Sequence, residues 1–123
     1  MMITLLDENF SQINQFLSEK SFSKIFILVD ENTHEYCLPI LLGNLETEIS
    51  FEILEVEPGE EMKNIQTANH LWEILTGMQA DRKALIINLG GGVITGMGGF
   101  VASTYKRGIK CIIVPITLLS IRD

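Results

Sequence analysis

Several features that would assign this 123-residue chain to a specialised class are missing or scarce. It has two cysteines, Cys37 and Cys111, far apart, in apolar surroundings and without a CxxC spacing. We interpret both as small buried hydrophobes in a reducing compartment rather than as a disulfide or redox pair. No apolar run approaches the roughly eighteen residues that cross a membrane. The first eight residues are too acidic and too briefly apolar for a signal peptide. These absences predict a soluble cytoplasmic protein.

Positive charge is also scarce. The chain has nine Lys and Arg residues and 16 Asp and Glu residues, which gives a net charge of −7 and a pI of about 4.7. Because nucleic-acid binding needs a basic face, this class of partner is disfavoured. His34 and His70 form no HxxxH, HxH or Cys/His spacing, so we assign no metal ligand. No Ser/His/Asp or Cys/His catalytic arrangement is legible either.

What the sequence does contain is a regular succession of short apolar runs. They occupy residues 25–29, 51–56, 85–87 and 111–114, about thirty residues apart, as in βαβ units. The runs at 25–29 and 85–87 are apolar on both faces, which is typical of central parallel strands, whereas 51–56 alternates with glutamates as an edge strand does. With 46% hydrophobic residues, the chain fits one domain over residues 1–123. We predict an α/β, Rossmann-like, three-layer domain with a mostly parallel sheet and helices on both faces.

Helical periodicity lies between these runs. Apolar residues recur at spacings of three and four in two segments, at Phe10, Ile13, Phe16 and Leu17, and at Ile65, Ala68, Leu71, Trp72, Leu75 and Met78. Between residues 30 and 45 the pattern is less clean, because Pro39 would break any helix that began at Thr33. We therefore expect a kinked or restarted helix there.

The most specific segment runs from Ala84 to Leu119. An apolar strand leads into Gly90-Gly91-Gly92, which opens a glycine-rich helix that ends at the basic turn Lys106-Arg107-Gly108 before a second apolar strand. Backbone amides at such a turn, and the positive end of the helix dipole, favour a pyrophosphate. The triplet is not a GxGxxG fingerprint, since residue 95 is threonine, and a turn that needs positive φ would account for one or two of its glycines.

Three further glycines, Gly96, Gly98 and Gly99, fall inside the expected helix. Each weakens a helix by about 1 kcal/mol relative to alanine. Their number indicates close backbone packing or the approach of a ligand.

Polar or glycine-rich residues follow all four runs, at 30–32, 58–63, 90–93 and 115–117. In parallel sheets, ligands bind beyond the carboxyl ends of the strands, so we expect these segments to converge on one crevice. A purely structural role stays open for each of the polar side chains. Asp30 and Asn32 could be turn or N-cap residues, Glu60 and Lys63 a surface ion pair, and Arg107 a helix C-terminal cation beside a capping glycine.

Taken together, these blocks resemble the amino-terminal half of 3-dehydroquinate synthase. That family carries an Asp-Glu-Asn-like turn, a PxGExxK segment, a GGGVxxDxxGFxAxxxxRG block and a PTTLL segment leading to an aspartate. All four blocks are present here, in order, over essentially the full chain. Other sugar-phosphate cyclases and the glycerol dehydrogenase group share the fold and the glycine-rich turn, but match the GFVAxxYxRG portion less well.

The resemblance implies that NAD lies across the strand ends and that a partner subunit completes the site. For the cofactor, the resemblance implies Asp30 and Asn32 on the adenosine side, Glu60 and Lys63 at the ribose and phosphates, Gly91, Gly92 and Val93 at the pyrophosphate, and Thr117 and Leu119 near the adenine. For the substrate, it implies that Asp123 faces it near the nicotinamide and that Arg107 reaches its phosphate from a partner subunit. A homodimer is therefore implied.

The family is a phosphorus-oxygen lyase of the shikimate pathway that uses zinc and NAD. It converts 3-deoxy-D-arabino-heptulosonate 7-phosphate to 3-dehydroquinate and phosphate. Its zinc ligands and substrate lysines belong to a second, helical domain outside these 123 residues, so we expect the chain alone to be inactive.

Departures from the family pattern lie in or beside the implied cofactor site. Gly96 stands where the family has an aspartate, Ile116 where it has a threonine, and Ile121 and Arg122 precede the final aspartate. We therefore expect weak NAD binding. Two rival interpretations are a metal-dependent polyol dehydrogenase of the glycerol dehydrogenase type and a non-enzymatic remnant domain.

Overall fold

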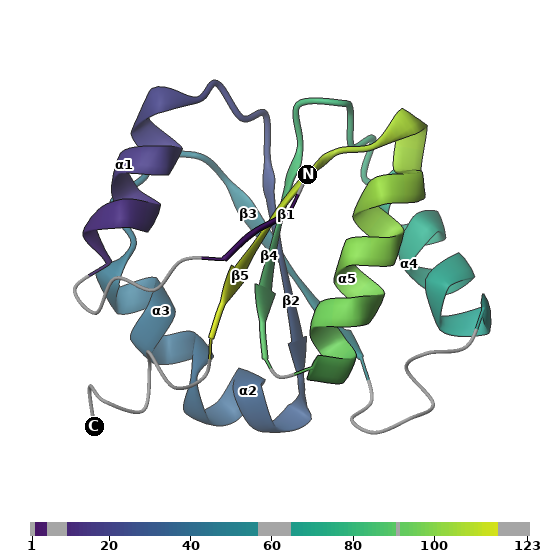
Figure 1. The fold of residues 1–123 in the computed structure, drawn as a ribbon, viewed down its shortest axis with the longest axis horizontal. Coiled ribbons are helices and arrows are strands. Elements are labelled where there is room, and N and C mark those ends of the chain that lie inside the picture. The colour runs from purple at the N-terminus through teal and green to yellow at the C-terminus, as the bar shows by residue number, and fades with distance from the viewer. Residues whose placement is uncertain (1, 5–9, 57–64, 91, 116–123) are drawn as a thin grey trace.

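The computed structural model describes residues 2–4, 10–56, 65–90 and 92–115. They form a five-stranded sheet between two layers of helices (Figure 1). The strands are β1 (Met2–Thr4), β2 (Ile25–Asp30), β3 (Phe51–Val56), β4 (Leu85–Leu89) and β5 (Lys110–Val114). Their order is β1-β5-β4-β2-β3, and every pair is parallel. The predicted α/β, Rossmann-like class is confirmed.

The position of each strand in the sheet follows its sequence pattern. β2 and β4 are central and buried on both faces, apart from the partly exposed Asp30, and β3 forms an edge of the described sheet with Phe51 44% exposed. These assignments confirm the predictions made from the apolar runs. Strand β1 was not predicted, because three residues are too few to show a period-two pattern. Its pairing with β5 defines it instead.

Helices α1 (Ser11–Glu19) and α3 (Leu38–Asn44) lie on one side of the sheet, and α4 (Ile65–Gly77) and α5 (Gly92–Thr104) on the other, whereas α2 (Glu31–Tyr36) lies beyond the carboxyl ends of the central strands (Figure 1). The predicted restart is confirmed: α2 ends before Cys37, and Pro39 occupies the first turn of α3, where its missing N–H costs nothing. The first of these two short helices begins at Glu31, because Asp30 caps it.

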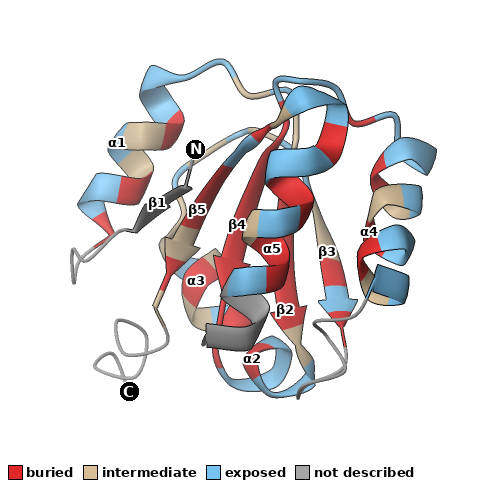
Figure 2. Cartoon of the chain, turned by 45° about the vertical axis from the view of Figure 1, so that its right-hand side comes forward, coloured by how far each residue is buried: buried red, intermediate tan, exposed pale blue. Residues whose placement is uncertain are grey.

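Two apolar layers hold the helices to the sheet, because alternate strand residues point to opposite faces. Figure 2 shows that the buried residues lie along the strands and on the sides of the helices that face them. Phe26, Leu28 and Ile86 pack with α4 and α5, whereas Ile25, Ile27, Val29 and Ile87 pack with α1 and α3. Each fully buried aliphatic side chain contributes about 1.5–3 kcal/mol.

One part of the predicted helical stripes is wrong. Ile65 and Met78 are 58% and 40% exposed. Ile65 is the first residue of α4 and Met78 follows its last, so neither belongs to the buried middle of the helix, where Ala68, Leu71 and Leu75 lie.

Gly98 determines how closely α5 approaches the sheet. A Cβ added there would lie 1.7 Å from Oδ1 of Asn88, a fully buried residue of β4. Asn88 donates from Nδ2 to Cys111 Sγ at 2.6 Å, whereas its Oδ1 is buried without a hydrogen-bond partner. The interpretation of close backbone packing is therefore confirmed at Gly98. At Gly96 a Cβ would meet nothing within 4 Å.

Candidate functional site

The carboxyl ends of the strands meet at one edge of the sheet. Asp30 at the end of β2 pairs with Val56, and Leu89 at the end of β4 pairs with Val114. Helix α5 begins beside this edge at Gly92, three residues after β4 ends at Leu89 (Figure 1). The topology therefore brings the end of β2 and the start of α5 to the same side of the molecule, as the spacing of the motifs predicted.

The amino end of α5 is suited to an anion. The helix has 13 residues, no acidic residue in its first turn and no charged residue along its length. Its aligned peptide dipoles place about half a positive charge at this end, together with amides that no earlier turn can satisfy. Gly92 and Val93 lie in this first turn, so the structure places these two predicted residues at the carboxyl edge of the sheet.

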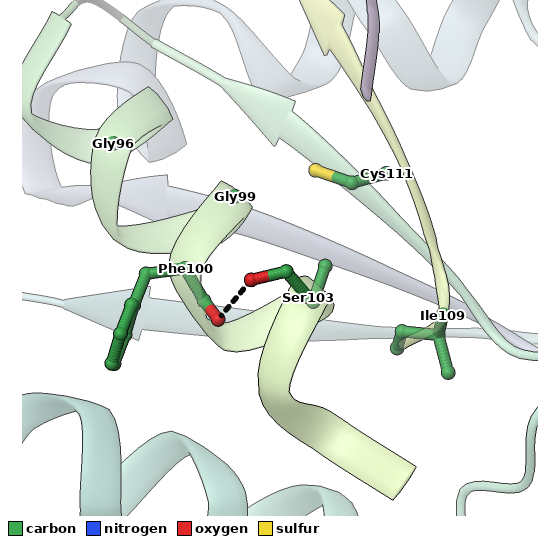
Figure 3. Close-up of a pocket in the computed structure, with 7 residues that line it drawn as sticks. Gly96, Gly99, Phe100, Ser103, Ile109 and Cys111 are labelled. Atoms are coloured by element: carbon green, nitrogen blue, oxygen red, sulfur yellow. Dashed lines mark hydrogen bonds between the residues drawn. The ribbon is translucent and has the colours of Figure 1, made fainter. Parts of the chain in front are cut away.

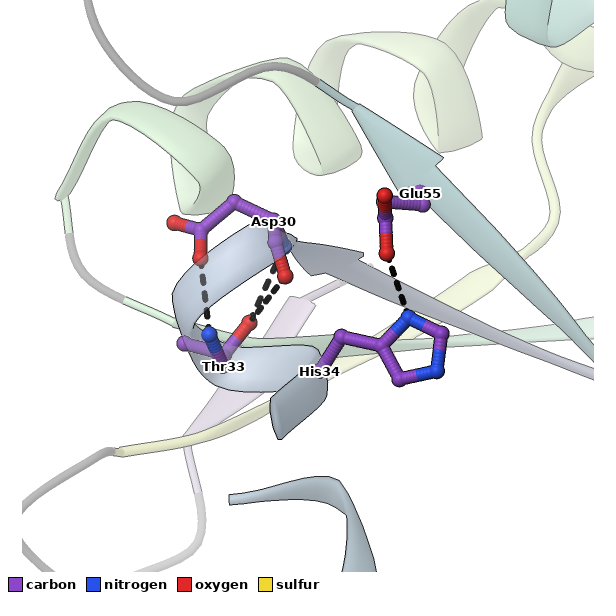
Figure 4. Close-up of polar contacts among 4 residues, drawn as sticks. All are labelled: Asp30, Thr33, His34 and Glu55. Atoms are coloured by element: carbon purple, nitrogen blue, oxygen red, sulfur yellow. Dashed lines mark hydrogen bonds and ion pairs between the residues drawn. The ribbon is translucent and has the colours of Figure 1, made fainter. Parts of the chain in front are cut away.

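Asp30 has a structural role at the same edge (Figure 4). The backbone N–H of Thr33 donates to its Oδ1 at 2.8 Å, and its own N–H donates to Thr33 Oγ1 at 2.9 Å. This reciprocal capping box begins α2 and is worth about 1 kcal/mol. The N-cap interpretation is thus confirmed. The second carboxylate oxygen points away from Thr33, and Asn32 is exposed on the first turn of α2.

An ion pair that sequence reasoning missed lies next to this cap. His34 of α2 contacts Glu55 of β3 through its Nδ1 (Figure 4). Both side chains are about half exposed, so the pair contributes at most about 1 kcal/mol. It connects α2 to the edge strand. The two residues are 21 positions apart and share no motif, so only the pairing of β2 with β3 could have indicated the contact.

Arg107 lies at the opposite end of α5. It belongs to the 3-10 turn η2 (Tyr105–Arg107), which leads into the amino end of β5, and Gly108 ends this turn with a φ of 106°. The prediction of a cation beside a capping glycine is confirmed. Arg107 has a φ of 70° and lines a cavity of about 380 Å³ with Arg82 and Lys110. Within one subunit, the structure does not bring Arg107 to the strand ends.

Several predicted site residues lie outside the described part of the chain. They are Glu60, Lys63, Gly91, Thr117, Leu119 and Asp123. Their assigned roles therefore stay predictions.

A second cavity, of about 320 Å³, lies along the flank of α5 (Figure 3). It is lined by Gly96, Gly99, Phe100, Ala102, Ser103, Ile109 and Cys111.

The interpretation of both cysteines as buried hydrophobes is confirmed, since Cys37 and Cys111 are free and buried. Burial raises the pKa of the Cys111 thiol to about 11, although the hydrogen bond from Asn88 opposes this.

The raised pKa predicts a loss of stability in alkali. The unfolded thiol has a pKa near 9, so between pH 9 and 11 the unfolded state loses its proton first. The contribution of the protonated Cys111 thiol to the free energy of unfolding is fully present below pH 9. At pH 10, ionisation of this thiol in the unfolded state lowers the free energy of unfolding by about 1 kcal/mol. Urea unfolding at pH 8 and pH 10 measures this, with Cys111→Ala as the control. Equal pH dependence in both proteins would contradict the prediction.

The described residues hold neither a metal-ligand cluster nor a membrane-spanning helix. No three His, Cys, Asp or Glu side chains gather there as a possible metal site. None of the helices in this part of the chain has the length and apolarity to cross a membrane.

These observations define the class of domain to which the chain belongs. A parallel α/β sheet whose carboxyl edge meets the amino end of a glycine-rich helix is a Rossmann-like domain of the kind that binds ligands at its strand ends. Residues 53–123, more than half of the chain, match the family model described as 3-dehydroquinate synthase N-terminal. The chain belongs to the 3-dehydroquinate synthase family.

Similar proteins agree with this assignment. A 3-dehydroquinate synthase of Parabacteroides distasonis is 41% identical over 113 residues, which are 92% of this chain and 32% of that protein. The chain thus spans about a third of this relative. Among solved structures, 2-deoxy-scyllo-inosose synthase has a TM-score of 0.79 at 22% identity, covering 93% of this chain and 32% of that one. A 2-epi-5-epi-valiolone synthase of Streptomyces hygroscopicus, solved with NAD⁺ and Zn²⁺, has a TM-score of 0.65 at 21% identity, covering 94% and 32%. At these identities, the two structures support the fold.

Proposed function

We propose that residues 1–123 are the NAD-binding domain of a 3-dehydroquinate synthase. The whole protein would convert 3-deoxy-D-arabino-heptulosonate 7-phosphate to 3-dehydroquinate and phosphate, and the chain alone would be inactive. The observation that carries the proposal is the convergence of the α5 amino end with the end of β2. The family assignment supports it, as does the NAD⁺ bound in the valiolone synthase of the same fold.

The described residues fit a dinucleotide at this edge. The first turn of α5, with Gly92 and Val93, would donate backbone N–H groups to the pyrophosphate, which the helix dipole also favours. The outward carboxylate oxygen of Asp30 would accept from a ribose hydroxyl on the adenosine side, with Asn32 beside it. When bound, NAD would supply a hydride acceptor and donor. Among the residues outside the described ranges, Glu60 and Lys63 would bind the ribose and phosphates, Gly91 the pyrophosphate, and Thr117 and Leu119 the adenine rim.

The substrate would be contacted from two sides. Asp123 would face it near the nicotinamide, and Arg107 of a partner subunit would bind its phosphate. The position of Arg107 supports the second role, because it lies at the far end of α5 from the carboxyl edge of its own sheet. The protein would therefore act as a homodimer. We assign no zinc ligand to these 123 residues.

Calorimetry with NAD tests the cofactor site. The unmodified chain should bind weakly, because Gly96 offers no carboxylate. The double variant Gly96→Asp with Ile116→Thr should bind about tenfold more tightly, through one or two recovered hydrogen bonds. A Cβ at Gly96 meets nothing within 4 Å, so the space for the aspartate exists.

The control for this experiment is Gly77→Asp. Gly77 also has nothing within 4 Å of an added Cβ, but it ends α4, at the other edge of the sheet. This variant should leave NAD affinity unchanged. Tight binding by the unmodified chain, or no gain in the double variant, would count against the proposed cofactor site.

A further inference from the structure

The turn that carries Arg107 has a strained backbone. Lys106 and Arg107 have φ values of 44° and 70°, in the left-handed region that side chains disfavour. A third such residue, Gln79 with a φ of 59°, lies between α4 and β4. Residues stay in this region where the surrounding structure fixes the backbone, and they gather at functional sites. A glycine at position 107 would avoid the strain, so the fold carries this arginine at a cost in free energy.

One hydrogen bond joins the two strained segments. Tyr105 is 5% exposed, and its hydroxyl donates to the carbonyl oxygen of Ala80, the residue after Gln79, at 2.8 Å. The two segments lie side by side because they lead into β4 and β5, whose first residues, Leu85 and Lys110, are paired. Because the hydroxyl and the carbonyl are both buried, water does not readily replace this bond when it is lost.

Backbone hydrogen bonds close the same turn on the side of α5. The N–H of Gly108 donates to the carbonyl of Tyr105 at 2.7 Å, and the N–H of Ile109 donates to that of Ala102 at 2.8 Å. These bonds fix where the chain leaves α5 and where it enters β5. The side chain of Tyr105 adds a link to a third segment, the one that follows α4.

Arg107 has two other cations beside it and no carboxylate. It lines the cavity of about 380 Å³ together with Arg82 and Lys110. Within residues 2–4, 10–56, 65–90 and 92–115, none of these three side chains takes part in an ion pair. The two like charges strengthen the attraction of this surface for an anion, and the planar guanidinium matches the oxygen atoms of a phosphate. The exposed Arg107 is therefore available to an anion carried by another molecule.

We propose that Tyr105 is a positioning residue for Arg107. Its hydroxyl, through the bond to the Ala80 carbonyl, holds the strained turn in the conformation that presents the Arg107 side chain. Less conformational freedom is then lost when a phosphate binds. Tyr105 is buried and does not itself touch the substrate. The step from Arg107 to the substrate phosphate rests on the proposed function, whereas the hold of Tyr105 on the turn does not.

NMR relaxation of the ¹⁵N-labelled chain tests this hold. In the unmodified protein, the amide order parameters of Lys106 and Arg107 should be about 0.85, as in a rigid backbone. Tyr105→Phe keeps the ring but removes the hydroxyl, and should lower both toward about 0.6. Unchanged order parameters in Tyr105→Phe would overturn the proposal.

Thr104→Val is the matched control for this measurement. It removes a hydroxyl one position earlier, which accepts from Trp72 Nε1 at 3.0 Å and so also links α5 to α4, but outside the turn. The order parameters of Lys106 and Arg107 should stay at about 0.85 in this variant. An equal fall in both variants would show that any loss of contact with α4 loosens the turn, and would overturn the specific role of Tyr105.

Kinetics of the whole enzyme test the consequence for the substrate. Tyr105→Phe should raise KM for the phosphorylated substrate about fivefold and leave kcat nearly unchanged, because a phosphate contact contributes equally to the ground state and the transition state. With Arg107→Gln already in place, Tyr105→Phe should change KM by less than about twofold, since residues that act together are not additive. An equal rise in KM in both backgrounds would show a merely structural role for Tyr105 and overturn the inference.

Failure of the proposed function would give a different result. If Arg107→Gln alone left KM unchanged, the proposed role of Arg107 at the substrate phosphate would be refuted, and the effect of Tyr105 on the substrate with it. If Arg107→Gln raised KM but Tyr105→Phe did not, the role of Arg107 would stand and the positioning role of Tyr105 would be refuted.

Discussion

Replacing Gly98 with alanine should lower the free energy of unfolding by about 1–3 kcal/mol. The same change at Gly96, two residues earlier in α5, should raise it by up to about 1 kcal/mol, because alanine is the better helix former. The difference lies in the surroundings. An added Cβ would lie 1.7 Å from Asn88 Oδ1 at Gly98, but would meet nothing within 4 Å at Gly96. At Gly98, the free-energy cost of overpacking exceeds the gain from the better helix propensity of alanine.

Urea unfolding of the two single variants measures this pair of effects. The cause can be isolated with Asn88→Ala, because the three atoms nearest to the added Cβ all belong to the Asn88 side chain. Combined with Asn88→Ala, the Gly98→Ala change should cost at least 1 kcal/mol less than it does alone, since residues in contact couple by about 0.5–3 kcal/mol. If the two changes were additive, the close approach of α5 to β4 would not be the reason for the glycine.

The second large effect concerns Asp30, whose carboxylate both caps α2 and faces the proposed cofactor. Asp30→Asn should leave the free energy of unfolding within about 0.5 kcal/mol of the unmodified protein, because asparagine caps helices as well as aspartate does. NAD affinity should nevertheless fall about tenfold or more, because the neutral amide accepts a weaker hydrogen bond from the ribose than the charged carboxylate. The comparison is made in the Gly96→Asp, Ile116→Thr background, where binding is strong enough to measure.

Asp30→Ala is the companion variant. It should lose NAD affinity to at least the same extent and also about 1 kcal/mol of stability, because the N–H of Thr33 loses its acceptor. An Asp30→Asn protein that binds NAD normally would show that the aspartate serves only as the cap.

The sequence allowed the fold to be predicted well. Residues 25–29 and 85–87 are apolar at every position, which is typical of a strand covered on both sides, and they form the central strands β2 and β4. Pro39 correctly indicated the break between α2 and α3. Strand β1 could not be foreseen, because three residues show no period and their pairing with β5 is a contact across more than a hundred positions.

The candidate site was predictable only in part. The order of the motifs predicted that Asp30 and Gly92 lie at the same edge of the sheet, since the carboxyl ends of parallel strands align there. The sequence could not separate the cap role of Asp30 from a ligand role, because both use the same carboxylate. Nor could it show that Gly98 rather than Gly96 is required by packing, since this depends on where Asn88 points. The contact between His34 and Glu55 joins residues of different elements and has no sequence signature.

An NMR titration of the ¹⁵N-labelled chain with NAD tests the proposed cofactor site most directly. We expect the amide signals of Glu31, Asn32, Gly92 and Val93, at the carboxyl edge of the sheet, to shift with increasing NAD. The signals of Arg82, Gly108 and Lys110, at the opposite edge, should stay in place. Shifts confined to the opposite edge, or none at either edge even in the Gly96→Asp, Ile116→Thr variant at millimolar NAD, would contradict the assignment of this domain as an NAD-binding one.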